Sequence, residues 1–118
     1  KEINDTFGHL VGDSVLKNLA VIFEDNLRAS DVVARFGGEE FVLLLSDTDV
    51  KGAELLAEKL RSDVENFKFE GLGGTRLTIS IGMSESVDLD ASVNEIVKRA
   101  DDALYKAKEG GRNRAVVG

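Results

Sequence analysis

The 118-residue chain has a net charge of −7, with 42% apolar and 31% charged residues, and it contains no cysteine. This composition is typical of one globular domain, and it excludes a disordered chain, a disulfide framework and a thiolate metal site. The acidic balance argues against a protein that coats a nucleic acid polymer, and no apolar run approaches the ~18 residues that a membrane-spanning helix needs.

Helices are expected at the start of the chain. Residues 1–7 have the pattern of a helix end that Gly8 closes, and Asp13 is a suitable N-cap for a second helix. The second helix would bury one apolar face, made of Leu16, Leu19, Ala20, Phe23 and Leu27. Because an α/β core rarely begins with a helix, we expect that a first strand belongs before residue 1 and is absent from this sequence.

Two short strands are predicted on either side of a glycine-rich acidic turn, at residues 32–36 and 40–46. Gly37-Gly38 tolerates the positive φ angles of a two-residue turn, so the pattern predicts a β-hairpin that carries Glu39 and Glu40 at a sheet edge. A rigid hairpin can hold a carboxylate where a divalent cation or a reacting hydroxyl requires it. Taken alone, the tetrapeptide favours a simpler interpretation, which is a Gly-Gly turn with exposed acids.

A third helix, which is also amphipathic, is predicted after the hairpin, with Thr48 or Asp49 as its N-cap. Its apolar face comprises Ala53, Leu56, Ala57, Leu60 and Val64. Glycines cluster over residues 71–74 and indicate a loop. The alternation of apolar and polar residues over 76–84 then predicts a half-buried strand.

A fourth helix is predicted to begin at the capping box that Ser92 and Glu95 form, and to end at Gly110-Gly111. Its inward face comprises Val93, Ile96, Val97, Ala100, Leu104 and Ala107. Residues 113–117 read as a closing strand. This order of elements predicts an α/β (α+β) fold with a central mixed, partly antiparallel sheet flanked by helices, and the lack of internal linkers predicts a single domain over residues 1–118.

Further polar motifs surround the hairpin in a fixed order. They are Asn4-Asp5, Gly8-His9, Gly12-Asp13, Arg28-Ala29-Ser30-Asp31, and the segments 103–108 and 111–114. Together with Gly-Gly-Glu-Glu-Phe, these motifs resemble the GGDEF-domain diguanylate cyclases in their GGEEF variant, from Lys1 to about Val117. The resemblance implies a nucleotide-cyclase-like (ferredoxin-like) fold and a cytoplasmic catalytic domain, with any membrane anchor in another domain. It also implies that two GTP molecules are condensed into cyclic di-GMP and two pyrophosphates.

The resemblance assigns roles to the acids of the hairpin and to two cations. It implies that Glu39 binds metal and accepts the proton of the attacking 3′-hydroxyl, while Glu40 supports the metal, which would be Mg²⁺ or Mn²⁺. Lys108 and Arg112 would bind the β- and γ-phosphates of GTP. The alternative for both cations is a solvated helix end, where positive charge is favourable in any case.

Three upstream residues are implied to contact the nucleotide. Asn4 and Asp13 would bind guanine, because a carboxylate accepts from the two donors on the guanine edge and an amide can both donate and accept. His9, the only histidine, would lie beside the substrate. The ordinary interpretations are a helix end for Asn4, an N-cap for Asp13 and a structural or exposed position for His9.

The Arg28-x-x-Asp31 element resembles the product-binding inhibitory site of the family, through which cyclic di-GMP limits its own synthesis. Either Lys59 or Arg61 would complete that site. From the residues alone, such a pair is more often a surface salt bridge, which contributes at most about 1 kcal/mol.

The resemblance implies a homodimer, because each domain would present one GTP to the other, and an upstream sensory or receiver domain as regulator. The family's other metal-binding aspartate would precede Lys1, so we expect the isolated fragment to be inactive. The alternatives are a non-catalytic cyclic di-GMP receptor that uses Arg28 and Asp31, a dimerisation module, and an enzyme that makes a linear or hybrid dinucleotide. The intact Glu39-Glu40 pair favours the cyclase over the receptor.

Overall fold

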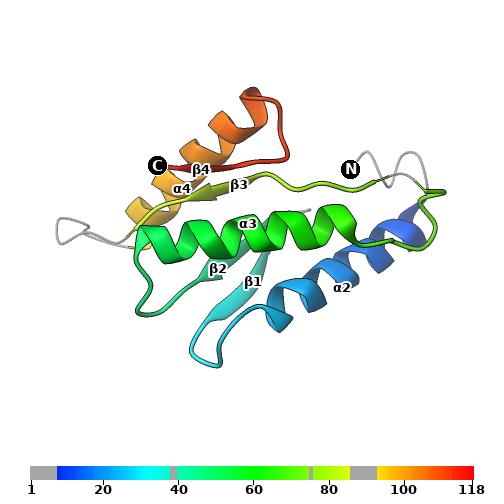
Figure 1. Ribbon diagram of the computed structural model, residues 1–118, viewed down its shortest axis with the longest axis horizontal. Coiled ribbons are helices and arrows are strands. Elements are labelled where there is room, and N and C mark those ends of the chain that lie inside the picture. Colours follow the sequence, from blue (N-terminus) through cyan, green and yellow to red (C-terminus); the bar gives the residue numbers. More distant parts are fainter. Residues whose placement is uncertain (1–7, 38–39, 75, 86–92) are drawn as a thin grey trace. The chain divides into compact units, whose positions relative to one another are not determined.

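The computed structural model describes residues 8–37, 40–74, 76–85 and 93–118. Within these ranges the chain forms, in order, α2 (His9–Asp25), β1 (Val32–Gly37), β2 (Glu40–Leu44), α3 (Val50–Asn66), β3 (Ile81–Met83), α4 (Val93–Glu109) and β4 (Ala115–Val117) (Figure 1). This order confirms the predicted α/β class. The helix end predicted at residues 1–7 lies outside the described ranges.

The contacts divide the chain into two compact units. One comprises Lys1–Ser46 and Asn66–Leu77, and the other comprises Asp47–Glu65 and Thr78–Gly118. The first unit contains the antiparallel pair β1–β2 and the second contains the parallel pair β3–β4. Both strand orientations that a partly antiparallel arrangement requires are therefore present.

In the first unit, α2 begins five residues earlier than predicted. Gly8 is its N-cap, with a φ of 92° and no side-chain cap hydrogen bond, and the Gly12 N–H donates to the Gly8 carbonyl at 3.1 Å. Asp13 is thus a residue within the helix, and its prediction as an N-cap is wrong. The Gly12-Asp13 pair looks like a helix start in the sequence, but one internal glycine costs a helix only about 1 kcal/mol, which burial of the helix face can offset.

The core of the first unit includes the inner face of α2. Leu19 and Phe23, two of the predicted core residues, are buried together with Val15, and the other predicted residues are half-buried. Phe23 meets Phe41 of β2 edge-on, with ring centroids 5.1 Å apart and an interplanar angle of 77°. Such aromatic pairs add about 0.5–1.5 kcal/mol to the stabilisation from burial, so this contact fastens the hairpin to α2.

In the second unit, Asp49 caps α3, because its Oδ1 accepts a hydrogen bond from the Gly52 N–H at 2.9 Å. Ala57, Leu60 and Val64 of α3 are buried. These three residues belong to the predicted apolar face, so the helical periodicity and one of the two proposed caps are confirmed.

The helix α4 packs against both β3 and β4. It begins directly after the predicted cap Ser92, which lies outside the described residues, and it ends just before Gly110. Ala103 and Ala107 are its buried residues. Ala107 is a predicted core residue, whereas Ala103 extends the predicted face by one position.

The last two strands are shorter than predicted, with β3 at Ile81–Met83 and β4 at Ala115–Val117. Their parallel pairing runs only from Ile81↔Ala115 to Met83↔Val117. The physical reason is the backbone before β4, because Arg112 and Asn113 have positive φ angles of 63° and 47° and turn the chain. Because β4 starts only at Ala115, residues 76–80 have no strand residues of β4 with which to pair.

Within the described ranges, no helix combines the length and the apolar character needed to cross a lipid bilayer.

Candidate active site

The hairpin of the first unit carries the acidic motif. β1 and β2 pair antiparallel from Val32↔Leu44 to Gly37↔Glu40, which confirms the predicted hairpin. Gly37 belongs to β1, so the connection consists of residues 38–39 rather than Gly37-Gly38. The register shifts between Arg35 and Gly37, and a bulge of this kind redirects the side chains that follow it. Glu40 is exposed at the closed end of the ladder, and Glu39 lies outside the described residues.

The start of α2 carries two of the predicted nucleotide contacts. His9 is the first residue of the helix, although its side chain lies outside the description, and Asp13 is exposed four residues later. Residues four apart share one face of a helix, so the fold puts both at neighbouring positions of that face. Asn4 lies outside the described residues.

The loop from α2 to β1 forms a tight polar corner around Arg28 and Asp31. The Asp31 carboxylate accepts hydrogen bonds from the backbone N–H groups of Arg28 and Ser46, each at 3.0 Å, and the Asp31 side chain is only 4% exposed. These donors hold the pKa of the Asp31 carboxyl below its ordinary value. The Arg28 guanidinium lies 3.5 Å from the same carboxylate, donates to the Ser46 carbonyl, and is 58% exposed. We call this arrangement the Arg28–Asp31 corner, and it has more hydrogen bonds to the backbone than an isolated surface ion pair would have.

The end of α4 carries the two predicted phosphate-binding cations. Lys108 lies in the last helical turn and Arg112 follows the Gly110-Gly111 step, and both are exposed. The helix is closed by a Schellman pair, in which the Gly111 N–H donates to the Lys108 carbonyl at 3.3 Å and the Arg112 N–H donates to the Ala107 carbonyl at 2.9 Å. Within the described part of the chain, no carboxylate forms an ion pair with either cation.

The predicted residues thus fall into two groups. Glu40, Asp13 and the Arg28–Asp31 corner belong to the first unit, whereas Lys108 and Arg112 belong to the second. Lys59 and Arg61, the two candidates for completing the inhibitory site, lie on α3. Lys59 is 61% exposed and pairs with Asp63 at 2.8 Å, while Arg61 is only 18% exposed.

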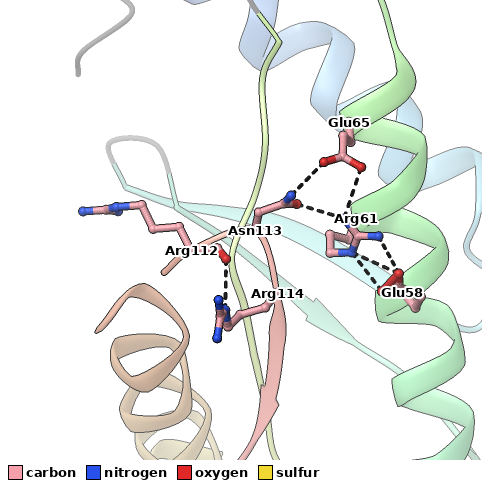
Figure 2. Close-up of polar contacts among 6 residues, drawn as sticks. All are labelled: Glu58, Arg61, Glu65, Arg112, Asn113 and Arg114. Atoms are coloured by element: carbon pink, nitrogen blue, oxygen red, sulfur yellow. Dashed lines mark hydrogen bonds and ion pairs between the residues drawn. The ribbon is translucent and has the colours of Figure 1, made fainter. Parts of the chain in front are cut away.

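Sequence reasoning missed a polar network that joins α3 to the segment after α4 (Figure 2). Arg61 donates to Glu58 through Nε at 2.8 Å and through Nη2 at 2.5 Å, and to the Asn113 Oδ1 through Nη1 at 3.0 Å. The Asn113 amide in turn donates to Glu65 at 2.7 Å. The side-chain hydrogen bond between Arg61 and Glu58 raises the pKa of Arg61 and lowers the pKa of Glu58. The only signal in the sequence was an asparagine, which tolerates positive φ, shortly after a glycine helix stop.

An open hollow of about 390 Å³ lies beside this network in the second unit. Its lining includes Glu58, Arg61, Met83 and Asn113. Neither of the predicted phosphate-binding cations lines it, so we do not assign it to the nucleotide.

Glu40 is the candidate metal ligand that the structure describes. Among the described residues, no group of three or more His, Asp or Glu side chains gathers as a metal site would require, and Glu39 lies outside them. Mg²⁺ takes one or two protein carboxylates and completes its shell with water and phosphate oxygens. The hard oxygen donors of an exposed carboxylate at the end of a hairpin fit the chemistry of that ion.

Comparison with known proteins agrees with this geometry. The family model for "Diguanylate cyclase, GGDEF domain" matches residues 1–114. Diguanylate cyclase A of Treponema denticola is 44% identical over 120 residues, which cover 99% of this chain and 32% of the relative. The active GGEEF domain of a diguanylate cyclase from Vibrio cholerae superposes with a TM-score of 0.91 at 38% identity, covering 98% of this chain and 73% of that one. The coiled coil and GGDEF domain of DgcB from Caulobacter crescentus, in complex with c-di-GMP, gives 0.92 at 28% identity, covering 99% and 63%.

The chain spans about a quarter to a third of the length of the curated relatives it matches. The family match covers nearly all of the chain, and the acidic hairpin, the helices and the order of the motifs agree with it. The resemblance inferred from the motifs is therefore confirmed, and the chain belongs to the diguanylate cyclase GGDEF-domain family.

Proposed function

We propose that residues 1–118 form the catalytic domain of a diguanylate cyclase, which joins two GTP molecules into cyclic di-GMP and releases two pyrophosphates. The observation that carries the proposal is the exposed Glu40 at the closed end of a bulged hairpin, within the motif Gly-Gly-Glu-Glu-Phe. Membership of the family and the likeness to the active GGEEF domain of Vibrio cholerae support it.

The two adjacent glutamates are assigned the chemistry. Glu39 takes the proton of the attacking 3′-hydroxyl, and it would hold a divalent cation, Mg²⁺ or Mn²⁺, to which Glu40 would add a second carboxylate. The cation, when bound, neutralises negative charge on the triphosphate. The ladder of β1 and β2 supports the part assigned to Glu40, because a rigid frame keeps a ligating group in place without a further loss of entropy.

The remaining site residues are assigned to substrate binding. Asn4, His9 and Asp13 contact the guanosine, while Lys108 and Arg112 bind the β- and γ-phosphates. Asp13, Lys108 and Arg112 are exposed on or beside helices, which supports a role in contacting a ligand. The fork of Arg112 and the point charge of Lys108 suit the triphosphate.

The reaction requires two domains. Each domain presents one GTP, so that the 3′-oxygen of one nucleotide meets the α-phosphate of the other, and most of the rate enhancement comes from this proximity. A homodimer is therefore part of the proposal. A sensory or receiver domain in the full-length protein would control the enzyme by governing whether the two catalytic domains meet.

Cyclic di-GMP is proposed to inhibit its own synthesis through the Arg28–Asp31 corner. The related DgcB structure contains c-di-GMP. In this chain the Arg28 side chain is 58% exposed, whereas Asp31 is 4% exposed and already accepts two backbone hydrogen bonds. We therefore assign the first contact with the product to Arg28, and Asp31 holds the corner in shape before it accepts from guanine.

The proposal is tested by incubating the full-length protein with GTP and Mg²⁺ and identifying the product by mass spectrometry. The expected product is cyclic di-GMP. A linear dinucleotide, or a hybrid product when ATP is added, would replace the proposed reaction by another nucleotidyl transfer. Binding of cyclic di-GMP without any synthesis would identify a receptor and overturn the proposal.

A further inference from the structure

The segment after α4 has an unusual backbone. Arg112 and Asn113 both have positive φ angles, 63° and 47°. This left-handed region is uncommon for residues other than glycine, although asparagine tolerates it better than arginine does. Two such residues in succession persist only where the surrounding contacts hold them.

The backbone of Arg112 is held on both sides. Its N–H donates to the Ala107 carbonyl at 2.9 Å, and its carbonyl accepts a hydrogen bond from the Arg114 Nε at 3.1 Å. The Arg112 side chain is nevertheless exposed, and Figure 2 shows it extending away from Asn113 and Arg61. The main chain of this residue is thus fixed, while its guanidinium is available to a ligand.

Asn113 connects this fixed segment to α3. Its amide donates to Glu65 at 2.7 Å and its Oδ1 accepts from Arg61 at 3.0 Å. Arg61 and Glu65 are only 18% and 24% exposed, and Glu58 orients Arg61 by accepting hydrogen bonds from its Nε and Nη2. Both polar groups of the Asn113 side chain are therefore engaged by a pre-arranged, charged pair, which makes the connection directional.

We infer that Asn113 is a positioning residue for Arg112. By holding the backbone next to Arg112, Asn113 sets the direction in which the Arg112 guanidinium meets the triphosphate of GTP. The inference rests on the proposed function, because it takes Arg112 to bind the GTP phosphates. A guanidinium that starts from a fixed backbone loses less conformational freedom on binding than one on a mobile segment. Asn113 thereby strengthens GTP binding without touching the nucleotide.

The variant Asn113→Gly isolates this role. Glycine adopts positive φ without strain, so the variant keeps the backbone conformation accessible and removes both side-chain hydrogen bonds. The full-length wild type and the variant are titrated, with Mg²⁺, against the non-hydrolysable α,β-methylene analogue of GTP and against GMP. Loss of the two charge-assisted hydrogen bonds of Asn113, next to the residue that binds the phosphates, should weaken binding of the analogue about tenfold. Binding of GMP should not change, because GMP lacks the β- and γ-phosphates.

An exchange of partners provides the rescue. Asn113→Asp alone places a second carboxylate against Glu65 and should weaken binding of the analogue at least as much as Asn113→Gly does. Combined with Glu65→Gln, it restores an amide–carboxylate hydrogen bond with the donor on α3, and affinity should return to within about threefold of wild type. In an Arg112→Ala background, Asn113→Gly should cause no further loss, because the residue that it positions is absent.

Equal affinity of wild type and Asn113→Gly for the analogue would overturn the inference. An equal loss for GMP and for the analogue would also overturn it, because general structural damage does not distinguish the two nucleotides. A wild-type protein that fails to bind the analogue would contradict the proposed function itself, and the positioning role would fall with it.

Discussion

Two corners of the chain present an arginine, and they hold it in different ways. At the Arg28–Asp31 corner the guanidinium takes part in the fold, because it donates to the Ser46 carbonyl and lies 3.5 Å from Asp31. At the corner after α4, the side chain of Asn113 holds the backbone instead, through hydrogen bonds to Arg61 and Glu65 on α3. There the guanidinium of Arg112 has no partner within the described residues.

The difference indicates two ways in which a fold prepares a cation for a ligand. A guanidinium that belongs to its own scaffold must give up hydrogen bonds before it binds, which limits its affinity and suits a regulatory site. A guanidinium that the scaffold holds only through its backbone offers all of its donors to the ligand, which suits a substrate site. The proposed roles of Arg28 and Arg112 follow this division.

The largest expected effect on stability comes from a substitution at Gly82 in β3, the strand that supports the segment after α4. The adjacent Ile81 N–H donates to the Arg114 carbonyl at 2.9 Å, and a Cβ at position 82 would come within 2.1 Å of the Ala100 carbonyl oxygen. Gly82→Ala should therefore lower the free energy of unfolding by about 2 kcal/mol, as overpacking against a rigid backbone does. Urea unfolding followed by circular dichroism measures the change.

Gly52→Ala on α3 is the matched control for this prediction. A Cβ there would meet only the end of the Thr48 side chain at 3.0 Å and the Asp49 carboxylate at 3.4 Å, so the free energy of unfolding should stay close to wild type. Equal unfolding midpoints for the two variants would contradict the close approach of β3 and α4.

Arg28→Ala tests whether the Arg28–Asp31 corner binds the product. The variant should raise the concentration of cyclic di-GMP needed for half-maximal inhibition about tenfold, as expected for the loss of one charged contact. It should also lower the thermal stability of the protein slightly, because the Ser46 carbonyl loses its donor. Inhibition curves and thermal melts provide both values. If inhibition is unchanged, the Arg28–Asp31 corner is structural only.

The smallest effect is expected from Glu58→Gln, which changes the orientation of Arg61 only indirectly. The hydrogen bond from Arg61 lowers the pKa of Glu58 below its ordinary value of 4.5. A carboxyl whose pKa is lowered in the folded state stabilises the protein above its unfolded pKa, and this contribution disappears as the pH falls through the folded pKa. Wild type should thus be more stable than the variant at neutral pH, and the difference should vanish in acid. A difference in stability that does not depend on pH would exclude this cause.

Features that depend on neighbouring residues could be predicted from the sequence. The cap at Asp49 and the buried face through Ala57, Leu60 and Val64 follow from local hydrogen bonding and helical periodicity, and the structure contains both. The hairpin follows from two short β-apt runs around glycines, and its antiparallel pairing is as expected, whereas its connection lies one residue later than predicted, at residues 38–39.

Features that depend on distant residues could not be predicted. The start of α2 at His9 requires a positive φ at Gly8, and the continuation of the helix through Gly12 depends on packing that no short window of sequence contains. Asn113 meets partners 48 and 52 residues earlier in the chain, so no local pattern indicates the network. The roles of all the site residues stay predictions, and for Asn4 and Glu39 the position is one as well, because both residues lie outside the described part of the chain.

The most direct test of the central claim is the rate at which the full-length protein forms cyclic di-GMP from GTP and Mg²⁺, measured in parallel for wild type and Glu39→Gln. The account predicts synthesis by wild type and a rate at least about 100-fold lower in the variant, with an unchanged circular dichroism spectrum, because a proton acceptor is lost without disturbing the ladder of the hairpin. Substantial synthesis by Glu39→Gln would contradict the assignment of catalysis to this hairpin.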